Sequence, residues 1–578
     1  MMAQRLAEGA RVAEKARQLG LEIEDPLILD DPDSHKWDEE ADLVVVGLGG
    51  AGVSAALEAV ERGVSVIAVD RYEGGGSTAA NGGIFYAGGG TAVQKEAGEE
   101  DTPEEMYKYL KIEAGDVVSD ATLRRFVNES ASTVDWIMSH GGPFNSKTWR
   151  KKASYPPLDY FLYHPDNTLV GDYARRAKPA ARGHRAFVRN GKKAWGLGFA
   201  IYEPLRDAAL KRGMRFHRHS EARQLAVDSS GRVIGVKILS IPQGTPEAKR
   251  FSTYIDRANV FLAMLPPALP FAAVTIGIGN HYLRKAMAIE AHGRVERWIR
   301  AREGVLLSAG GYIMNPKMVA EHAPDYKEGM PNGTLGDQGS GIYLGLSAGG
   351  STALMSKISA WRFINPPKAW ADAIVVNARG QRFVDETVYG ATLGEHIGDH
   401  QGGRAWIIYD ASSRKAAFKQ ARDPILVPFQ RDVTLLNLMF NYKKAPTIEA
   451  LAAKMGFDPA VLAKTISDYN RAARGEAPDT FGKEIADIQP IDQGPFYAMD
   501  ISVASRFLPL PVISFGGLRV EEETGLVLDP NGKPIQGLYA AGRCAVGIAS
   551  QTYVSGLSYA DCVFSGRRAA RHVAKANA

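Results

Sequence analysis

The stretch that decides the fold class is residues 41–71, ADLVVVGLGGAGVSAALEAVERGVSVIAVDR. Its apolar run Leu43–Val46 predicts a parallel strand buried on both faces. A turn of the form G-x-G-x-x-G then opens a helical pattern, and a second apolar run over residues 64–69 closes with Asp70. Glycines permit the tight turn and the close approach of a pyrophosphate, and the acid is placed to bind a ribose. The stretch therefore predicts a Rossmann-like dinucleotide site in an α/β fold.

A second glycine-rich loop, EGGGSTAANGG over residues 73–83, follows Asp70 directly. An NAD enzyme does not require this loop. A flavoprotein does, because FAD lies extended and its flavin end needs further backbone contacts. Far along the chain, Val305–Gly311 and Gly537–Arg543 each place an apolar strand before a glycine turn. Each alone is an ordinary strand-to-turn exit, but together they predict an FAD-binding domain built from both chain ends, with another domain inserted between them.

The composition limits the class of protein. The chain has 578 residues, and 69 Lys and Arg against 65 Asp and Glu give a net charge of +4. A hydrophobic content of 45% with a charged content of 23% excludes a largely disordered chain, and the small net charge argues against a nucleic-acid partner. The two cysteines, Cys544 and Cys562, predict neither a metal site nor a disulfide framework, so we expect a cytoplasmic location.

The two ends of the chain are interpreted as helices. Residues 1–20 carry charges throughout and lack the apolar core of a signal peptide. A short helix that packs on the body or on a partner and stops at Gly20 is predicted from the spacing of Met2, Leu6, Ala13, Ala16 and Leu19. The terminal GRRAARHVAKANA, residues 566–578, is interpreted as the solvated end of a basic surface helix.

From about residue 41 onward the sequence resembles the flavoprotein family that unites fumarate reductases with 3-ketosteroid dehydrogenases. The segment Ile374–Glu386 is similar to the N-x-x-G-x-R-F segment of that family's substrate-facing domain. Within the family, the chain is most similar to the 3-oxosteroid Δ4-dehydrogenases. This finer resemblance is carried by GGIFYAGGGTAVQKEAG (82–98), PAARGH (179–184) and AGRCAVG (541–547).

The motifs and the resemblance together give the expected FAD contacts. The first turn and its acid contribute Gly47, Gly49, Gly50, Ala51, Gly52, Asp70 and Arg71. The second loop contributes Gly75, Gly76, Ser77, Thr78, Asn81, Gly82 and Gly83. Distant segments contribute Ala222, Ala309, Gly310, Gly542, Arg543 and Ser558.

Two positions separate the subgroups of this family. Fumarate reductases carry a histidine in an H-T-x-G-G motif, where this chain has Ile513–Gly517, and an arginine where its near-terminal loop has Tyr553. A dicarboxylate needs cations to replace its lost water, so a tyrosine there implies a neutral substrate. Steroid Δ1-dehydrogenases carry Y-P-G-P-G at this loop, whereas the run from Tyr553 to Gly556, YVSG, resembles the Δ4 subgroup.

The resemblance implies catalytic roles for four residues. Tyr389 stands at the tyrosine of the N-E-x-x-Y motif of ketosteroid dehydrogenases, with Asp385 in place of the asparagine. Tyr553, backbone N–H groups near Gly556 and a helix that begins after it would polarise the C3 carbonyl. Ser555 and Tyr389 would move the C4 proton, while the C5 hydride passes to flavin N5; in reverse, the same groups reduce a Δ4-3-ketosteroid.

Two other functions stay open. One is a Δ1-dehydrogenase, or another enone or enoate reductase of the same family. The other is a non-catalytic, membrane-bound flavin adaptor. The steroid, the direction of the reaction, the electron acceptor or donor and the oligomeric state are left open by the sequence.

An insertion after residue 250 predicts a membrane contact. Residues 258–283 hold no Asp, Glu, Lys or Arg, but Pro266, Pro267 and Pro270 argue against a spanning helix. Residues 284–302 are interpreted as a basic amphipathic helix that bears Arg284, Lys285, Arg294, Arg297, Arg300 and Arg302. An apolar hairpin beside such a helix predicts peripheral attachment to the inner face of the cell membrane; an oligomer interface or buried helical pair is the alternative.

The expected organisation has four parts. Residues 1–40 form a helix and linker, and residues 41–345 form the first part of the FAD-binding domain, with the insertion at 250–300. Residues 346–505 form the inserted catalytic domain, and residues 506–578 complete the FAD-binding domain. Helices are predicted over 106–114 and 121–138, and a helical pair opened by Pro459 in its second member is predicted over 447–474.

Overall fold

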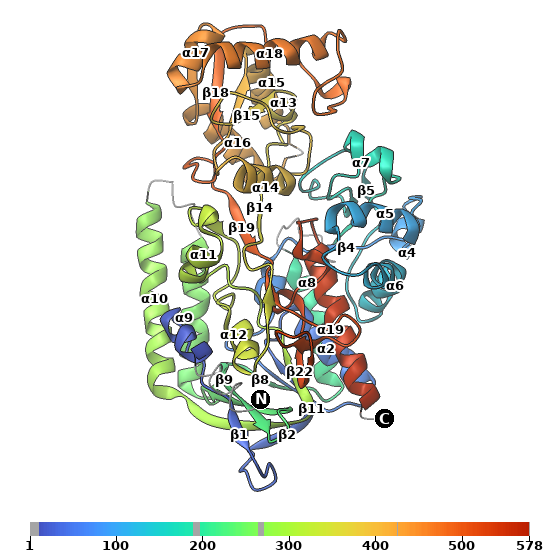
Figure 1. Ribbon diagram of the computed structural model, residues 1–578, viewed down its shortest axis with the longest axis vertical. Helices are drawn as coiled ribbons and strands as arrows, with labels where there is room; N and C mark the ends of the chain where they lie inside the picture. Colours follow the sequence, from blue (N-terminus) through green and yellow to red (C-terminus); the bar gives the residue numbers. More distant parts are fainter. Residues whose placement is uncertain (1–10, 189–196, 264–270, 425, 577–578) are drawn as a thin grey trace.

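The computed structural model describes residues 11–188, 197–263, 271–424 and 426–576. A nine-stranded sheet forms its base, in the order β1-β9-β10-β11-β2-β3-β8, with β22 paired to β11 and β21 paired to β22 (Figure 1). The strands are β1 (Leu27–Leu29), β2 (Glu39–Val46), β3 (Val66–Val69), β8 (Arg215–His217), β9 (Ser220–Asp228), β10 (Val233–Ser240), β11 (Val295–Leu307), β21 (Leu526–Leu528) and β22 (Pro534–Ala540).

The strand–turn–helix–strand unit predicted at residues 41–71 is confirmed. Strands β2 and β3 pair in parallel with Val44 opposite Ile67, and helix α2 (Gly50–Glu61) lies between them in the chain. Strand β11 pairs in parallel with both β2 and β22, with Val305 opposite Leu538. One sheet therefore holds strands from both ends of the chain, as the two distant glycine turns predicted.

Helix α19 (Leu557–Ala576) lies against α2, and this contact corrects one prediction (Figure 1). Arg567 donates to Glu58 at 2.7 Å and Arg571 donates to the same carboxylate at 3.0 Å. Burial alone would raise the pKa of Glu58, but the two guanidinium groups outweigh it and lower the pKa to about 2. The prediction of a solvated basic end was wrong for these arginines because their four-residue spacing turns both toward α2.

A separate part of the molecule, residues 368–500, stands at the top of Figure 1 and is called the cap below. Its antiparallel sheet has the order β15-β16-β18-β17. Its elements are β15 (Ile374–Val376), β16 (Trp406–Tyr409), β17 (Lys443–Ala445), β18 (Phe496–Asp500), α13 (Lys368–Ala371), α14 (Gly390–His400), α15 (Ala411–Ala421), α16 (Pro428–Phe440), α17 (Ile448–Met455), α18 (Pro459–Ala473) and η2 (Ile485–Asp487). The predicted helical pair is confirmed as α17 and α18.

A small four-stranded sheet and its helices, residues 84–185, form what we call the side layer. Its elements are β4 (Ile84–Tyr86), β5 (Thr148–Trp149), β6 (Leu162–Tyr163), β7 (Gly183–Arg185), α4 (Ala92–Glu96), α5 (Pro103–Ala114), α6 (Asp120–Ser139) and α7 (Gly171–Arg176). The helices predicted over 106–114 and 121–138 are confirmed as α5 and α6.

Shorter elements connect these parts. They are α3 (Gly76–Ala80), α8 (Gly198–Lys211), α11 (Pro316–His322), α12 (Ser340–Ser347), β12 (Met330–Pro331), β13 (Thr352–Ala353), β14 (Ile358–Ala360), β19 (Pro511–Ser514), β20 (Gly517–Leu518), η1 (Pro324–Tyr326), η3 (Gly542–Cys544) and η4 (Ile548–Ser550). Strand β19 pairs with β12 and β14 and leads the chain from the cap back toward the large sheet (Figure 1).

The N-terminal helix is present over residues 11–18, and it ends before Gly20, whose φ is +83°. Ala13 and Ala16 are fully buried, and Lys15 pairs with Glu321 at 2.6 Å. This part of the predicted helix therefore packs on the body. Met2 and Leu6 lie outside the described residues.

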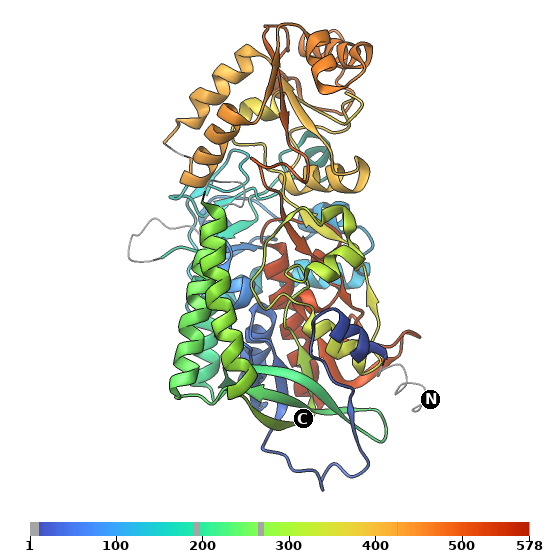
Figure 2. The same cartoon turned by 90° about the vertical axis from the view of Figure 1, so that its left-hand side faces the viewer.

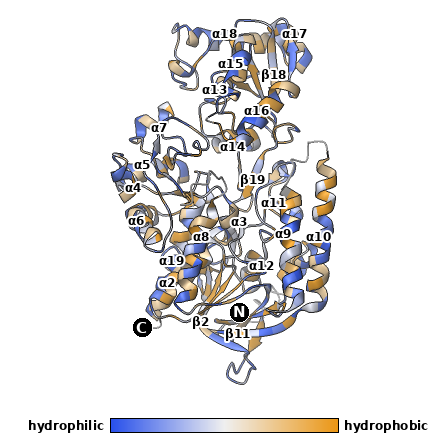
Figure 3. Ribbon diagram, turned by 180° about the vertical axis from the view of Figure 1, so that it is seen from behind, coloured by the Kyte–Doolittle hydropathy of each residue, from blue (hydrophilic) through white to orange (hydrophobic). Residues whose placement is uncertain are grey.

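The insertion forms an antiparallel helical hairpin, α9 (Pro246–Ala263) and α10 (Ala272–Gly293), that stands beside the large sheet (Figure 2). Its inner side has an apolar cluster with Ile241, Phe251, Ile255 and Ala286. Both helices mix apolar and polar stretches (Figure 3), and exposed apolar side chains are those of Val260, Phe271, Val274, Ile278 and Met287. Pro266, Pro267 and Pro270 fall outside the described residues. In the part of the chain that is described, no helix combines the length and apolarity needed to cross a bilayer.

The prediction of a basic amphipathic helix over residues 284–302 is confirmed as far as Gly293, within α10, and was wrong for residues 294–302. Helix α10 ends at Gly293, and β11 begins at Val295, where it pairs with β10 and then with β2. The arginines bind acids of the protein: Arg294 contacts Glu221 at 2.6 Å, Arg297 contacts Glu39 at 3.5 Å, Arg300 contacts Asp33 at 2.7 Å and Arg302 contacts Asp42 at 2.8 Å. Backbone pairing on both edges overrides the helical spacing of these residues.

Candidate active site

A cavity of about 370 Å³ opens beside the carboxyl ends of β2 and β11. Segments that are far apart in the sequence form its walls. The lining residues are Gly47, Gly49, Gly50, Ala51, Asp70, Tyr72–Gly74, Gly76–Ala80, Ile255, Asp256, Asn259, Ser308–Gly310, Thr334–Asp337, Gly542, Arg543 and Cys562. Twelve of the predicted FAD contacts are therefore gathered at one cavity: Gly47, Gly49, Gly50, Ala51, Asp70, Gly76, Ser77, Thr78, Ala309, Gly310, Gly542 and Arg543.

The first turn has no room for side chains. Gly47 has a φ of +93°, and a Cβ built there would lie 2.5 Å from the Cα of Ala309 on β11's exit turn. A Cβ on Gly52 would lie 2.1 Å from the carbonyl oxygen of Gly47. These glycines therefore let β2, β11 and α2 close around the cavity floor.

Asp70 ends β3 at the cavity wall, as predicted. Its carboxylate accepts from the backbone N–H of Leu48 at 2.9 Å and of Tyr72 at 2.8 Å. Burial raises the pKa of Asp70, and the N–H donors oppose that rise. The carboxylate thus has a fixed orientation beside the turn and retains acceptor capacity for a ribose.

The second glycine loop forms helix α3 and seals one side of the cavity. The hydroxyl of Thr78 accepts from the N–H of Gly50 at 3.1 Å, and Ser77 hydrogen-bonds to Asp337. Gly75 has a φ of +82° just before α3. Farther along, Asn81 accepts from the N–H of Gly83 at 2.8 Å and orders the end of the loop.

Arg543 provides a test of whether a cofactor fits this cavity. One of its terminal nitrogens donates to Asp337 at 2.6 Å. Its Nη1 is buried and has no hydrogen-bond partner among the described residues. An unpaired buried guanidinium N–H is costly, so an acceptor supplied by a bound molecule would satisfy it. The spare donor, the glycine floor and the ribose-facing acid together fit FAD.

Sequence reasoning missed Asp337 and Thr334, which bind Ser77 and line the same cavity. The glycine-rich run GTLGDQGSG over residues 333–341 was the signal that could have found them.

Some predicted contacts are placed elsewhere. The guanidinium of Arg71 binds Glu290 at 2.7 Å and Glu221 at 3.0 Å, which ties the hairpin and β9 to the segment after Asp70. Ala222 lies within β9, and Ser558 lies in the first turn of α19. Gly82 packs near Tyr155, and Gly52 and Gly83 pack against backbone. None of these six predicted contacts is among the described residues that line the cavity. Their contacts with FAD stay predictions.

Three tyrosines from distant segments converge on Ser555. Tyr389 precedes α14 in the cap, Tyr553 lies in the loop before α19, and Tyr163 comes from β6 of the side layer. The rings of Tyr389 and Tyr553 stack with centroids 6.4 Å apart and planes 14° apart, and the phenol of Tyr163 lies 3.5 Å from the hydroxyl of Ser555. The hydroxyl of Ser555 also lies close enough to the phenols of Tyr389 and Tyr553 to oppose the rise in their pKa. The structure thus brings the predicted Tyr389, Tyr553 and Ser555 together and adds Tyr163.

The environment keeps these phenols protonated. Burial raises the pKa of Tyr553 to about 12, although hydrogen bonds from Ser555 and from the backbone of Gly556 oppose the rise. Burial also raises the pKa of Tyr389 and Tyr163 well above the ordinary value. Gly556 has a φ of +85° and stands directly before α19, as predicted. The cluster can therefore donate hydrogen bonds near neutral pH.

Aromatic rings enclose the cluster. Trp361 lies 4.5 Å from Tyr553 between ring centroids, Phe515 stacks on Tyr553 at 6.3 Å, and Phe363 meets Tyr389 at 5.5 Å. Phe515 belongs to the segment Ile513–Gly517, which corresponds to the H-T-x-G-G motif of fumarate reductases. The surroundings of the phenols are apolar, which suits an uncharged hydrocarbon substrate.

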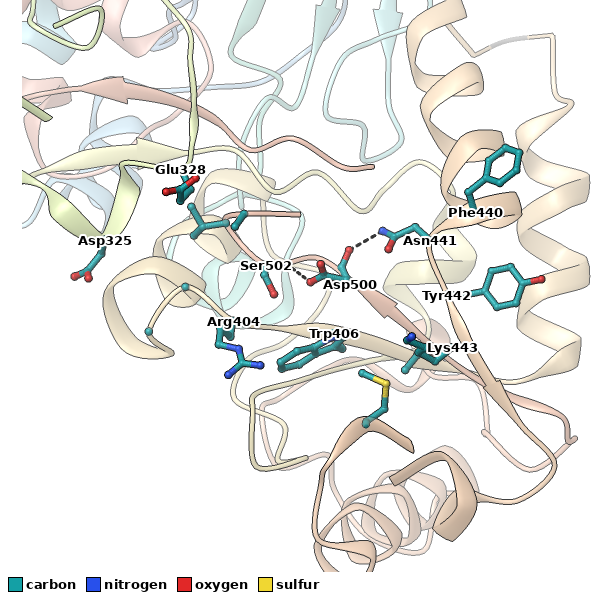
Figure 4. A pocket seen from close by; sticks show the side chains of 16 residues that line it. Asp325, Glu328, Arg404, Trp406, Phe440, Asn441, Tyr442, Lys443, Asp500 and Ser502 are labelled. Carbon is teal, nitrogen blue, oxygen red and sulfur yellow. Dashed lines mark hydrogen bonds between the residues drawn. The ribbon is translucent and has the colours of Figure 1, made fainter. Parts of the chain in front are cut away.

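A second pocket, of about 620 Å³, lies at the junction of the cap with η1 (Figure 4). Arg404 and Trp406 line its middle, Asp325 lies toward one end and Tyr442 toward the other (Figure 4). Asn441 donates to the backbone oxygen of Asp500 at 2.8 Å. Its described lining includes none of the predicted site residues, so the tyrosine cluster remains the candidate catalytic centre.

Several known proteins are similar to this chain over most of its length. The model of the FAD binding domain family matches residues 42–556. A 3-oxo-5-alpha-steroid 4-dehydrogenase from Comamonas testosteroni is 36% identical over 516 residues, which cover 88% of this chain and 94% of that protein. A 3-oxosteroid 1-dehydrogenase from Mycolicibacterium smegmatis is 24% identical and covers 89% of this chain and 94% of its own.

Among solved structures, a 3-ketosteroid Δ4-(5α)-dehydrogenase from Rhodococcus jostii, in complex with 4-androstene-3,17-dione, superposes with a TM-score of 0.77 at 28% identity. The alignment covers 95% of this chain and all of that one. With its cofactor cavity, its two glycine loops and a family match that spans most of its length, this chain belongs to the FAD binding domain family and is a flavoprotein.

Proposed function

We propose that this flavoprotein is a 3-ketosteroid Δ4-dehydrogenase, which desaturates the C4–C5 bond of 3-oxosteroids or reduces that bond in reverse. The observation that carries the proposal is the convergence of Tyr163, Tyr389 and Tyr553 on Ser555 inside an aromatic enclosure. A dicarboxylate would need a guanidinium at Tyr553. Phenols instead suit a neutral ketone, and the similarity to steroid 4-dehydrogenases supports this substrate class.

The carbonyl end of the substrate is assigned to Tyr553. Its phenol has a pKa of about 12, so it is a neutral hydrogen-bond donor to a C3 oxygen. The backbone of Gly556 opposes the rise in the pKa of this phenol, and α19 begins at the next residue, so its N-terminal dipole favours negative charge there. An oxyanion donor of this kind lowers the activation free energy by about 2.7–4 kcal/mol.

The C4 proton is assigned to Ser555 and Tyr389. Neither group is a free anion near neutral pH, so Ser555 accepts the C4 proton as it releases its own hydroxyl proton to Tyr389, and Tyr389 releases its phenol proton to solvent. Tyr163, the third partner of Ser555, holds the serine hydroxyl between the phenols. FAD, which the residues from Gly47 to Arg543 would hold, supplies the hydride acceptor.

The test is an anaerobic titration of the purified holoenzyme with 5α- and 5β-3-ketosteroids, followed by product analysis. We expect bleaching of the flavin and a Δ4 product. Tyr389→Phe and Tyr553→Phe should each bind FAD and slow this bleaching about 10²–10⁴-fold. Tyr409→Phe, at a buried tyrosine of β16 outside the cluster and the cofactor cavity, is the matched control. Turnover of fumarate-like diacids without any ketosteroid would reject the proposal, a Δ1 product would favour the related dehydrogenase, and absent bleaching would favour a flavin adaptor.

We also propose the division into a helix and linker (1–40), an FAD-binding domain (41–345 and 506–578) and an inserted catalytic domain (346–505). The main sheet and the separate sheet of the cap support it.

Peripheral contact with the inner membrane face is proposed for the hairpin. Phe271 is 78% exposed, Val274 58% and Val260 57%, and these three lie near the hairpin's outer end. Their exposure supports insertion into a headgroup region. The arginines from Arg294 to Arg302 do not support it, because they bind acids of the protein.

Sedimentation with anionic vesicles tests the contact. We expect the triple variant Val260→Ser/Phe271→Ser/Val274→Ser to leave the vesicle pellet while it keeps its flavin absorbance. Phe429→Ser, at a 40% exposed residue of the cap, is the control and should still pellet. Unchanged pelleting of the triple variant would end the proposal.

A further inference from the structure

Tyr389 stands at the boundary between the cap and the side layer. It is the N-cap residue of α14, and its own side chain makes no cap hydrogen bond to the helix. Its backbone N–H is bound from the other side of the boundary instead, because Asn167 of the side layer accepts it through Oδ1 at 2.6 Å. The backbone at this tyrosine is therefore fixed by a residue 222 positions away in the chain.

Asn167 is bound at both ends of its amide. Its Nδ2 donates to Glu113 of α5 at 2.9 Å and to the hydroxyl of Thr392, one turn into α14, at 2.9 Å. Its backbone N–H donates to the phenol of Tyr109 at 3.0 Å, and that phenol donates to Glu113 at 2.6 Å. The reversed amide would set its NH₂ against the N–H of Tyr389, so these partners fix its orientation.

Most of the network is buried. Asn167 is 1% exposed, Tyr109 is fully buried, and Glu113 is 7% exposed. Buried polar groups keep one arrangement when every partner is present, since any other arrangement leaves a group unpaired. Helix α5 therefore holds Asn167, and Asn167 holds the start of α14.

We propose that Asn167, oriented by Glu113, is a positioning residue that sets Tyr389 against Ser555 by binding the tyrosine's backbone N–H across the boundary of the cap. The proposal rests on the role of Tyr389 in the proposed function. A loss of this bond frees the backbone that carries the phenol, and a displacement near 1 Å can cost about 10²-fold in rate. The turnover number should fall while substrate binding, set by the aromatic walls, changes little.

The sharpest variant is Asn167→Asp. Above about pH 7, where Glu113 is ionised, a carboxylate at this position can still accept from Tyr389, but it cannot donate to Glu113 and places two carboxylates in contact. We expect kcat to fall about 10–100-fold with KM changed less than about threefold. Adding Glu113→Gln supplies the missing donor, since the new amide can donate to the aspartate and accept from Tyr109. The double variant should recover most of the lost kcat.

Two further arms separate this proposal from the alternatives. In a Tyr389→Phe background, Asn167→Asp should lower kcat no further, because its effect passes through Tyr389. Asn470→Asp, at another buried asparagine with backbone partners in the cap, controls for the general cost of such a change. All variants are compared as flavin-loaded enzyme, with the flavin absorbance and the unfolding temperature as checks on folding.

Wild-type kcat in Asn167→Asp, no rescue by Glu113→Gln, or additive losses in the Tyr389→Phe background would each overturn the proposal. Wild-type kcat in Tyr389→Phe itself would instead overturn the role of that tyrosine in the proposed function, so the two failures are distinguishable.

Discussion

Gly47 shows how a single missing side chain shapes the cofactor cavity. Its φ is +93°, and a Cβ added to it would lie 2.5 Å from the Cα of Ala309, which is a backbone atom. Backbone cannot step aside as a flexible side chain can, so the carboxyl ends of β2 and β11 would have to separate. The shape of the cavity floor therefore requires a glycine, whose side chain is a single hydrogen atom, at position 47.

Gly47→Ala should purify without bound FAD. Gly63→Ala is the matched control, because Gly63 has a similar φ of +80° but open space around its Cβ position. The control bears the cost of the left-handed backbone alone, about 1 kcal/mol, and should keep its flavin. The flavin absorbance of the purified variants measures how much FAD each one holds. Equal flavin content in both variants would contradict the prediction that a side chain at Gly47 disrupts the cavity.

Glu113 predicts a pH dependence of stability. Burial raises its pKa from 4.5 to about 7, with the carboxylates of Asp166 and Glu395 adding to the rise and bonds from Tyr109 and Asn167 opposing it. Because the folded pKa lies above the unfolded one, the stabilising contribution is complete below pH 4.5 and is lost as pH rises through about 7. Glu113→Gln removes this loss.

Denaturant unfolding at several pH values measures the effect. Between pH 4.5 and about pH 8 the variant should gain about 3 kcal/mol relative to the parent chain. Glu96→Gln, at an exposed acid of the same layer, is the control and should track the parent. A constant difference across this range would show that Glu113 titrates normally.

At this scale the sequence predicted residues whose chemistry is local. Asp70 and the glycines follow from one short motif, and the motif places them without knowledge of the rest of the chain. Tyr163 could not be found, because its contact with Ser555 spans 392 positions and is made by β6, a strand of two residues. Arg71 was assigned to FAD by its neighbours in sequence, yet Glu290 and Glu221 bind it from the hairpin and β9.

Helices α2 and α19 are joined by buried ion pairs. Glu58 is 4% exposed and receives both Arg567 and Arg571. Its pKa of about 2 lies below the ordinary 4.5, so its contribution to stability is present above pH 4.5 and is lost as pH falls through about 2.

Glu58→Gln should therefore destabilise the protein at neutral pH by about 3 kcal/mol. The penalty should shrink toward pH 2, where the parent carboxylate is protonated. Glu129→Gln, a half-exposed partner of Arg571, is the milder comparison, because a solvent-screened pair contributes less. Equal losses in the two variants would indicate that burial of Glu58 is not what matters.

Elements with a local period were predicted well, and those fixed by distant partners were not. Helices α5, α6, α17 and α18 follow their apolar spacing. Strand β11 has helical spacing in its first half, yet it pairs with β10 on one edge and β2 on the other. No window of sequence contains those partners, so the spacing alone predicted a helix.

At the scale of the whole molecule, the cofactor cavity joins segments from Gly47 to Arg543. A ligand that contacts the folded cavity and not the unfolded chain stabilises the entire fold. At about 100 times its Kd, FAD should add about 2.7 kcal/mol to the free energy of unfolding of the apoprotein.

Thermal unfolding of the apoprotein with added FAD tests this coupling. The unfolding temperature should rise with FAD and rise less with FMN, which lacks the adenosine that Asp70 is placed to bind. Far-ultraviolet circular dichroism and tryptophan fluorescence should shift together, because the sheet holds both chain ends. An equal effect of the two flavins would contradict the assignment of Asp70.

The assembly of one sheet from both chain ends was predictable, because two glycine turns after apolar strands lie far from the first one. How the hairpin joins that sheet was not predictable. Helix α10 passes through Arg294 alone into β11, and β11 ends beside Ser308–Gly310 in the wall of the cavity. Helix α10, strand β11 and the cavity wall are thus consecutive segments of the chain. A tilt of α10 would therefore reach the cavity wall by way of β11, a strand whose own position is set by its pairing with β10 and β2.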